Sequence, residues 1–180
     1  MQMAVRAIRV PQRWEPLDED PQFERLEVPQ DGRLLQIQNY WRGKCGGDGR
    51  LPGRADISPL ELRGLLPHVH LVGIEPGGLA RHPVYRIRLI GTAQTEFYGG
   101  DPTGKTLDAA FGPAHAGPFR RTFDWIRRHR EPVAYRARVF WRDQHEWMAF
   151  EGVQMPLAQN GVDVDMIFGG AAFYPARQIG

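Results

Sequence analysis

The last third of the chain carries three consecutive segments with the patterning of β-strands. They cover Val133–Trp141, Trp147–Leu157 and Val162–Phe173, and turns separate them at residues 142–146 and 159–161. In the first segment apolar side chains alternate with arginines, which is the period-two pattern of a strand that buries one face. Because connections this short join neighbouring antiparallel strands, the sequence predicts a three-stranded meander.

Two further strands are predicted earlier in the chain, at His68–Glu75 and Val84–Gly91. The pair Gly77-Gly78 lies between them and favours a tight turn, since glycine adopts the backbone angles that hairpins need. The sequence therefore predicts a second antiparallel hairpin.

Helical patterns precede and separate these strands. Apolar residues at helical spacing predict an amphipathic helix over Leu34–Trp41 and the longest helix around Phe119–Ile126. Ser58 and Glu61 have the spacing of a capping box, which predicts the start of a short helix. Two shorter helical turns are expected at residues 92–98 and 106–111.

This order of elements predicts an α+β domain with a five-stranded antiparallel sheet and its helices on one face. The opposite, outer face is expected to expose more apolar surface than a solvated sheet normally carries. The residues assigned to it are Phe140, Met148, Phe150 and Ile167. The helix at Leu34–Trp41, or the segment before it, would have to cover this surface within one chain or across a dimer. The sequence therefore predicts a homodimer.

The chain is expected to have three parts: a proline-rich N-terminal arm at 1–30, a domain at 31–174 that includes the first helix, and a tail at 175–180. The prolines of the arm prevent a long helix. Its apolar residues could dock on the domain or on a partner chain; they are Trp14, Leu17, Phe23 and Leu26.

Charge and cysteine content argue against several classes of protein. The 23 basic and 21 acidic residues nearly cancel and are spread along the chain, so nucleic-acid binding is not indicated. The single cysteine, Cys45, excludes an intramolecular disulfide and suits a reducing compartment. The N-terminus lacks the apolar stretch of a signal peptide, and no apolar run matches the length of a membrane span. A cytoplasmic protein with no membrane partner is expected.

Several segments resemble a bacterial PAS family, the fifth PAS subfamily, long catalogued only as a domain of unknown function. They are Gly49–Glu61, Leu65–His68, Tyr85–Thr92 and Gly100–Lys105. The resemblance covers about residues 31–174 and implies a PAS-like fold with a sensory or regulatory role. It implies no ligand or reaction that transfers residue by residue. Because the chain ends soon after the last predicted strand, we expect a stand-alone module that acts in trans, through contact with itself or with another protein.

Aromatic and apolar side chains are expected to converge between the sheet and the short helices. The candidate ligand-binding residues are Tyr85, Phe97, Tyr98, Phe111, Phe123, Trp125 and His70. This cluster is either a ligand cavity or a packed aromatic core. Arg86 could offer a bidentate partner for a ligand carboxylate if a bulge reversed its direction.

No cofactor or metal follows from the sequence. Flavin-binding PAS domains carry a cysteine on the helix after the second strand, whereas Cys45 precedes the first strand. Haem-binding relatives use a histidine on the long helix, where His115 and His129 only flank that segment. His68 and His70 alternate on one predicted strand and could face a metal or a ligand carboxylate together, but two ligands do not complete a metal site.

Three classes of function stay open: a small-molecule binder, a structural dimerisation module, and an enzyme on a cone-shaped fold like that of ketosteroid isomerase. The enzyme would need a buried aspartate near a tyrosine or histidine, for which Tyr85 and Tyr98 are available.

Overall fold

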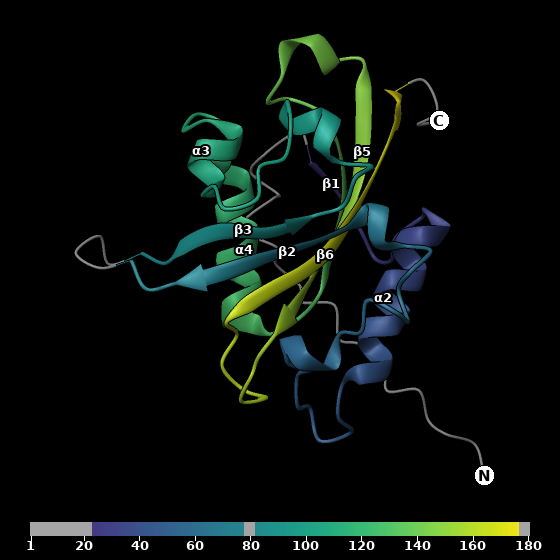
Figure 1. Ribbon diagram of the computed structural model, residues 1–180, viewed down its shortest axis with the longest axis vertical. Helices are drawn as coiled ribbons and strands as arrows, with labels where there is room; N and C mark the ends of the chain where they lie inside the picture. Colours follow the sequence, from purple (N-terminus) through teal and green to yellow (C-terminus); the bar gives the residue numbers. More distant parts are fainter. Residues whose placement is uncertain (1–22, 78–81, 177–180) are drawn as a thin grey trace.

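The computed structural model describes residues 23–77 and 82–176, and it confirms the α+β class. Six strands of these ranges form one antiparallel sheet in the order β1-β4-β5-β6-β2-β3 (Figure 1). Their bounds are β1 Phe23–Leu26, β2 Val69–Glu75, β3 Val84–Ile90, β4 Val133–Arg138, β5 Met148–Leu157 and β6 Met166–Pro175. The predicted meander is thus β4-β5-β6, and the predicted hairpin β2-β3 pairs with its last strand.

Within the described residues, three α-helices and several single 3-10 turns accompany the sheet. They are α2 Gly32–Lys44, α3 Leu107–Phe111 and α4 Ala116–His129, with η1 Arg54–Asp56, η2 Leu66–His68, η4 Thr95–Tyr98 and η5 Asp143–His145. Helix α2 begins where the Asp31 side chain accepts hydrogen bonds from the backbone N–H groups of Arg33 and Leu34. Within the described ranges, no helix has the length and apolar character that a membrane crossing requires.

The helices lie on both faces of the sheet. Figure 1 shows α2 against one face and α3 and α4 against the other. The prediction that the helices share one face therefore holds for α3 and α4 but not for α2. Each side of the sheet has its own apolar cluster, which makes the domain three-layered around the central strands.

The residues assigned from sequence to the outer face were assigned wrongly. Met148, Phe150 and Ile167 belong to the cluster beneath α3 and α4, and the half-buried Phe140 packs against it. The face beneath α2 is formed instead by Val153, Met155 and Phe168 with their neighbours, which pack with Leu34 and Ile37. All ten residues of β5 are buried, so the strand lacks the alternation of apolar and polar residues that would show which face of the sheet each side chain occupies. Helix α2 covers this face, and α3 and α4 cover the face that holds the four residues that suggested a dimer, so both apolar faces are covered within one chain.

The sixth strand comes from the segment expected to be an arm. β1 pairs with β4, with Phe23 opposite Ala137 and Leu26 opposite Ala134. The Phe23 ring packs edge-on against Phe119 of α4. Trp14 and Leu17, the other two apolar residues of the expected arm, lie outside the described residues, as does Gly78 of the predicted β2-β3 turn.

The capped helix predicted after Ser58 is replaced by consecutive turns that lead into η2. The Ser58 backbone N–H donates to the Tyr40 hydroxyl at 2.8 Å, and that hydroxyl donates to Glu61 at 2.7 Å. Glu61 also forms an ion pair with Lys44. The Glu61 carboxylate that would complete the capping box is thus bound by Tyr40 and Lys44 of α2. The predicted capping box is therefore wrong, because these tertiary contacts replace the local one.

Candidate ligand-binding cavity

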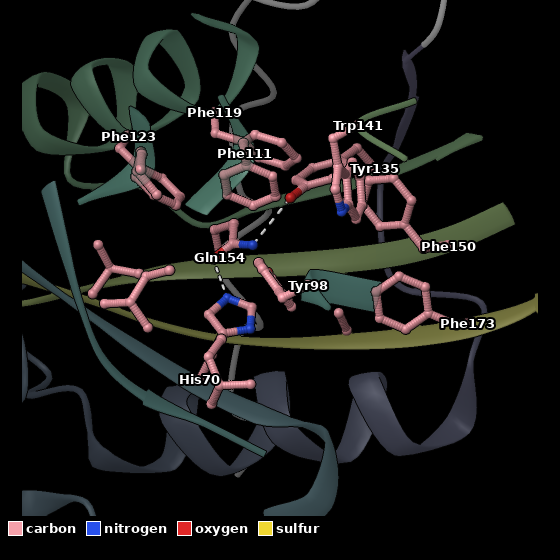
Figure 2. Close-up of a pocket in the computed structure, with 15 residues that line it drawn as sticks. His70, Tyr98, Phe111, Phe119, Phe123, Tyr135, Trp141, Phe150, Gln154 and Phe173 are labelled. Atoms are coloured by element: carbon pink, nitrogen blue, oxygen red, sulfur yellow. Dashed lines mark hydrogen bonds between the residues drawn. The ribbon is translucent and has the colours of Figure 1, made fainter. Parts of the chain in front are cut away.

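A small cavity lies between the inner face of the sheet and helices α3 and α4. It measures about 30 Å³, which is room for one or two water molecules. Figure 2 shows aromatic rings surrounding a polar centre formed by His70, Gln154 and Tyr135. The lining residues are His70, Val72, Ile87, Ile90, Tyr98, Leu107, Phe111, Phe119, Phe123, Tyr135, Trp141, Phe150, Gln154, Ala171 and Phe173.

The polar centre is built on neighbouring positions of three strands. In the sheet register His70 of β2 lies opposite Gly169 of β6, and Gly169 lies opposite Gln154 of β5. His70 Nε2 and Gln154 Oε1 are 2.8 Å apart. A Cβ at position 169 would lie 2.3 Å from that nitrogen and 2.4 Å from that oxygen. Glycine at this position is therefore what allows the two side chains to meet.

Tyr135 of β4 continues the same network. Gln154 Nε2 donates to the Tyr135 hydroxyl at 3.1 Å. The Tyr135 ring lies over Gly152, where a Cβ would be 2.9 Å from the hydroxyl oxygen. On the other side, His70 Nδ1 faces the amide of Gln94, 3.1 Å from Oε1, and Gln94 Nε2 has no partner among the described residues. The network therefore runs from Gln94, at the start of η4, to the hydroxyl of Tyr135.

Burial sets the protonation of these groups. It lowers the pKa of His70 below its ordinary value, and hydrogen bonds to the two glutamines only partly oppose this. It raises the pKa of Tyr135 and of Tyr98 above the ordinary value. At neutral pH the cavity is therefore lined by a neutral imidazole and two protonated phenols.

The structure brings four of the seven predicted site residues to the cavity: His70, Tyr98, Phe111 and Phe123. The other three lie elsewhere. Tyr85 donates to Asp124 of α4 and lines a separate groove. Phe97 stacks on Phe173 with ring centroids 3.7 Å apart, and Trp125 stacks on His129. Their rings belong to the packed core around the cavity.

Sequence reasoning missed two polar residues of the cavity, Tyr135 and Gln154, and the aromatic residues that β4, β5 and β6 and their connections contribute. Those aromatic residues are Trp141, Phe150 and Phe173. One signal was available: Gln154 is an uncharged polar residue in an otherwise apolar run, Gly152–Leu157. A buried amide in such a run needs partners, which points to a polar site.

The remaining candidates have structural partners. Arg86 forms a bidentate ion pair with Glu75 and does not reach the cavity. His68 lies in η2, where it contacts Arg33, so it does not share a face with His70. His129 and His115 face backbone carbonyl groups of α4 and α3.

Burial raises the pKa of Cys45 to about 11. No group of three or more potential metal-ligating side chains occurs in the described ranges.

A single antiparallel sheet with a small cavity beneath α3 and α4 places the chain in a class of α+β domains. Within this class the chain belongs to the PAS domain family, whose model matches residues 31–172. The resemblance predicted from the sequence is therefore confirmed, and it makes the chain a sensory or regulatory module in the general sense. Comparison with curated proteins and with solved structures gave no match.

Proposed function

We propose that this PAS domain responds to a small molecule that binds in the cavity between the sheet and α3 and α4. The observation that carries the proposal is the polar network inside an aromatic core. Burying a histidine, two glutamines and a tyrosine costs free energy that apolar side chains would not cost. Packing alone does not explain why three strands supply polar side chains to one point, with Gly169 and Gly152 making room for them.

The described conformation is closed. Ligand pockets commonly span roughly 300–1,000 Å³, whereas this cavity measures about 30 Å³. Binding therefore requires that a lining ring move. Tyr98 is the best placed, because it is only partly buried and ends η4 directly before Gly99, which adopts a positive φ of 75°. The ligand class that fits is a small, uncharged, mostly apolar molecule.

Fluorine NMR tests this with the full chain. The probes are fluorobenzene, para-fluoroacetophenone and para-fluoro-α-methylstyrene. We expect line broadening of at least one probe, and loss of that broadening in Ala171→Leu, which places a larger side chain at a lining position. The matched control is Ala172→Leu, because Ala172 is in the cluster beneath α2. Broadening that is unchanged in Ala171→Leu, or no broadening with any probe, would contradict the proposal.

A homodimer is a second proposal, supported now by a different observation. Trp147 is 60% exposed beside Arg138, Pro175 and Ala176, which together line a surface groove. An indole exposed at a groove is the kind of side chain that anchors protein interfaces. Native mass spectrometry of the wild type and of Trp147→Ser tests this: a dimer that dissociates in the variant supports it, and a wild-type monomer contradicts it.

A further inference from the structure

Two phenol hydroxyl groups line the cavity and donate a hydrogen bond to no described residue. The Tyr135 hydroxyl accepts from Gln154, so its own proton is unused. Tyr98 makes ring contacts with Phe111 and Trp141, and no described residue accepts its proton. The Tyr135 side chain is buried, and a buried donor without an acceptor is costly, typically by about 1–3 kcal/mol, whereas the Tyr98 side chain is only partly buried. The cavity therefore holds unmet donor capacity.

The direction of the network follows from His70. A neutral imidazole has one donor nitrogen and one acceptor nitrogen. Both ring nitrogens face a glutamine oxygen, Nε2 that of Gln154 at 2.8 Å and Nδ1 that of Gln94 at 3.1 Å, and a neutral ring can donate to only one of them. The shorter contact assigns the proton to Nε2. Nδ1 is then an acceptor, and a half turn of the Gln94 amide gives it the N–H group that otherwise lacks a partner. With the other tautomer Gln94 keeps a buried N–H unpaired, which is rarer in proteins than an unpaired carbonyl.

This direction leaves Tyr135 as a donor toward the cavity. Gln154 turns its oxygen toward His70 and its Nε2 toward Tyr135, so the amide group that faces the tyrosine hydroxyl is a donor and cannot accept the tyrosine proton. None of the lining residues is a lysine, arginine, aspartate or glutamate. An anionic occupant would therefore lack a counter-charge, and water would find few acceptors there.

We infer that the cavity selects an uncharged, mostly apolar molecule that carries a hydrogen-bond acceptor, such as a carbonyl oxygen, and that the Tyr135 hydroxyl donates to this acceptor with Tyr98 as the second donor. The inference rests on the proposed function and adds the chemistry of the occupant. His70 acts through Gln154 as a positioning residue, because its Nε2 proton fixes the orientation of the amide.

The test uses two of the fluorinated probes above. Para-fluoroacetophenone carries a carbonyl oxygen where para-fluoro-α-methylstyrene carries a methylene group, and the two are otherwise matched in shape. Both are titrated into the full-length Phe111→Ala variant, whose truncated side chain enlarges the cavity beside the network, and into Phe111→Leu in case the alanine variant is unfolded. We expect the ratio of affinities, ketone over alkene, to fall about fivefold when Tyr135→Phe is added, as the loss of one hydrogen bond predicts.

A ratio that Tyr135→Phe leaves unchanged, while both probes bind, overturns the acceptor inference and leaves the proposed function intact. Failure of every probe to bind counts against the proposed function instead. The wild type gives an independent readout that needs no variant: nitrogen NMR of histidine-labelled protein reports the His70 tautomer at neutral pH. We expect the Nε2–H form, and a proton on Nδ1 or on both nitrogens overturns the inference.

Discussion

His70 and Gln154 belong to strands that are not neighbours, yet their side chains meet at 2.8 Å above the strand between them. The strand between them is β6, and the residue beneath the contact is Gly169. The cavity thus depends on a missing side chain as much as on those present.

We expect Gly169→Ala to destabilise the domain by about 1–3 kcal/mol, because the new Cβ would overlap both partners and overpacked cores lose stability in this range. Urea unfolding measures the change. Gly43→Ala is the matched control, since Gly43 lies in α2 and a Cβ there meets nothing within 4 Å. That variant should be neutral or more stable by up to about 1 kcal/mol. Equal effects at the two positions would show that the 169 site tolerates a side chain.

Stability should fall as the pH drops below the ordinary pKa of histidine, near 6.5. Because burial lowers the pKa of His70 in the folded state, the unfolded chain binds the proton more readily. The loss begins near the unfolded value and continues toward the lower folded value, with a slope of at most about 1.4 kcal/mol per pH unit. Urea unfolding between about pH 7.5 and pH 5.5 measures it. His70→Gln should lose the His70 contribution to this slope, and an unchanged slope would contradict the assignment.

Tyr135→Phe and Tyr98→Phe should differ in stability although both remove one hydroxyl from the same cavity. Tyr135 accepts from Gln154, so its removal leaves a buried amide N–H unpaired and should cost about 1–2 kcal/mol. Tyr98 accepts from and donates to no described residue, so its removal should cost less than about 0.5 kcal/mol. Thermal or urea unfolding decides between them, and the reverse order would show that the network does not end at Tyr135.

A buried carboxylate anchors the N-terminus of α2. Glu151 of β5 is 1% exposed, and its Oε1 accepts from the backbone N–H groups of Gln30 and Asp31 at 2.5 and 2.9 Å. It also lies 3.7 Å from the guanidinium of Arg136. We expect Glu151→Ala to destabilise the domain by about 3–5 kcal/mol, because it leaves a partly buried cation and two N–H groups without their partner.

The control for this prediction is Glu24→Ala. Glu24 also lies 3.7 Å from Arg136 but is exposed, so its loss should cost less than about 1 kcal/mol. Hydrogen exchange of the first turn of α2 gives the local readout. Fast exchange in Glu151→Ala with slow exchange in Glu24→Ala is the expected pattern, and similar protection in both would show that α2 docks through its apolar face alone.

The sequence predicted the element order because the second half of the chain has clear turn residues between segments in which apolar and polar residues alternate. It did not predict β1, because this strand has only four residues, Phe23–Leu26, and so short an alternation of apolar and polar residues near Pro21 and Pro29 does not distinguish a strand from a loop. It assigned Phe150 and Ile167 to the wrong face because β5 is buried on both sides.

The cavity was predicted only in part for a related reason. Tyr98 and Phe111 come from short segments next to the predicted long helix, so their convergence follows from the order of elements. Tyr135 and Gln154 meet His70 through the register across four strands, and register depends on pairing between distant residues.

β5 takes part in both apolar clusters, with Gln154 in the network and the preceding Val153 packed in the cluster beneath α2. Consecutive residues of a strand are joined rigidly and point in opposite directions. A single peptide bond joins Gln154, which lines the cavity, to Val153, which packs beneath α2 on the opposite face of the sheet. A ligand that displaced Gln154 would therefore also move Val153 on that opposite face.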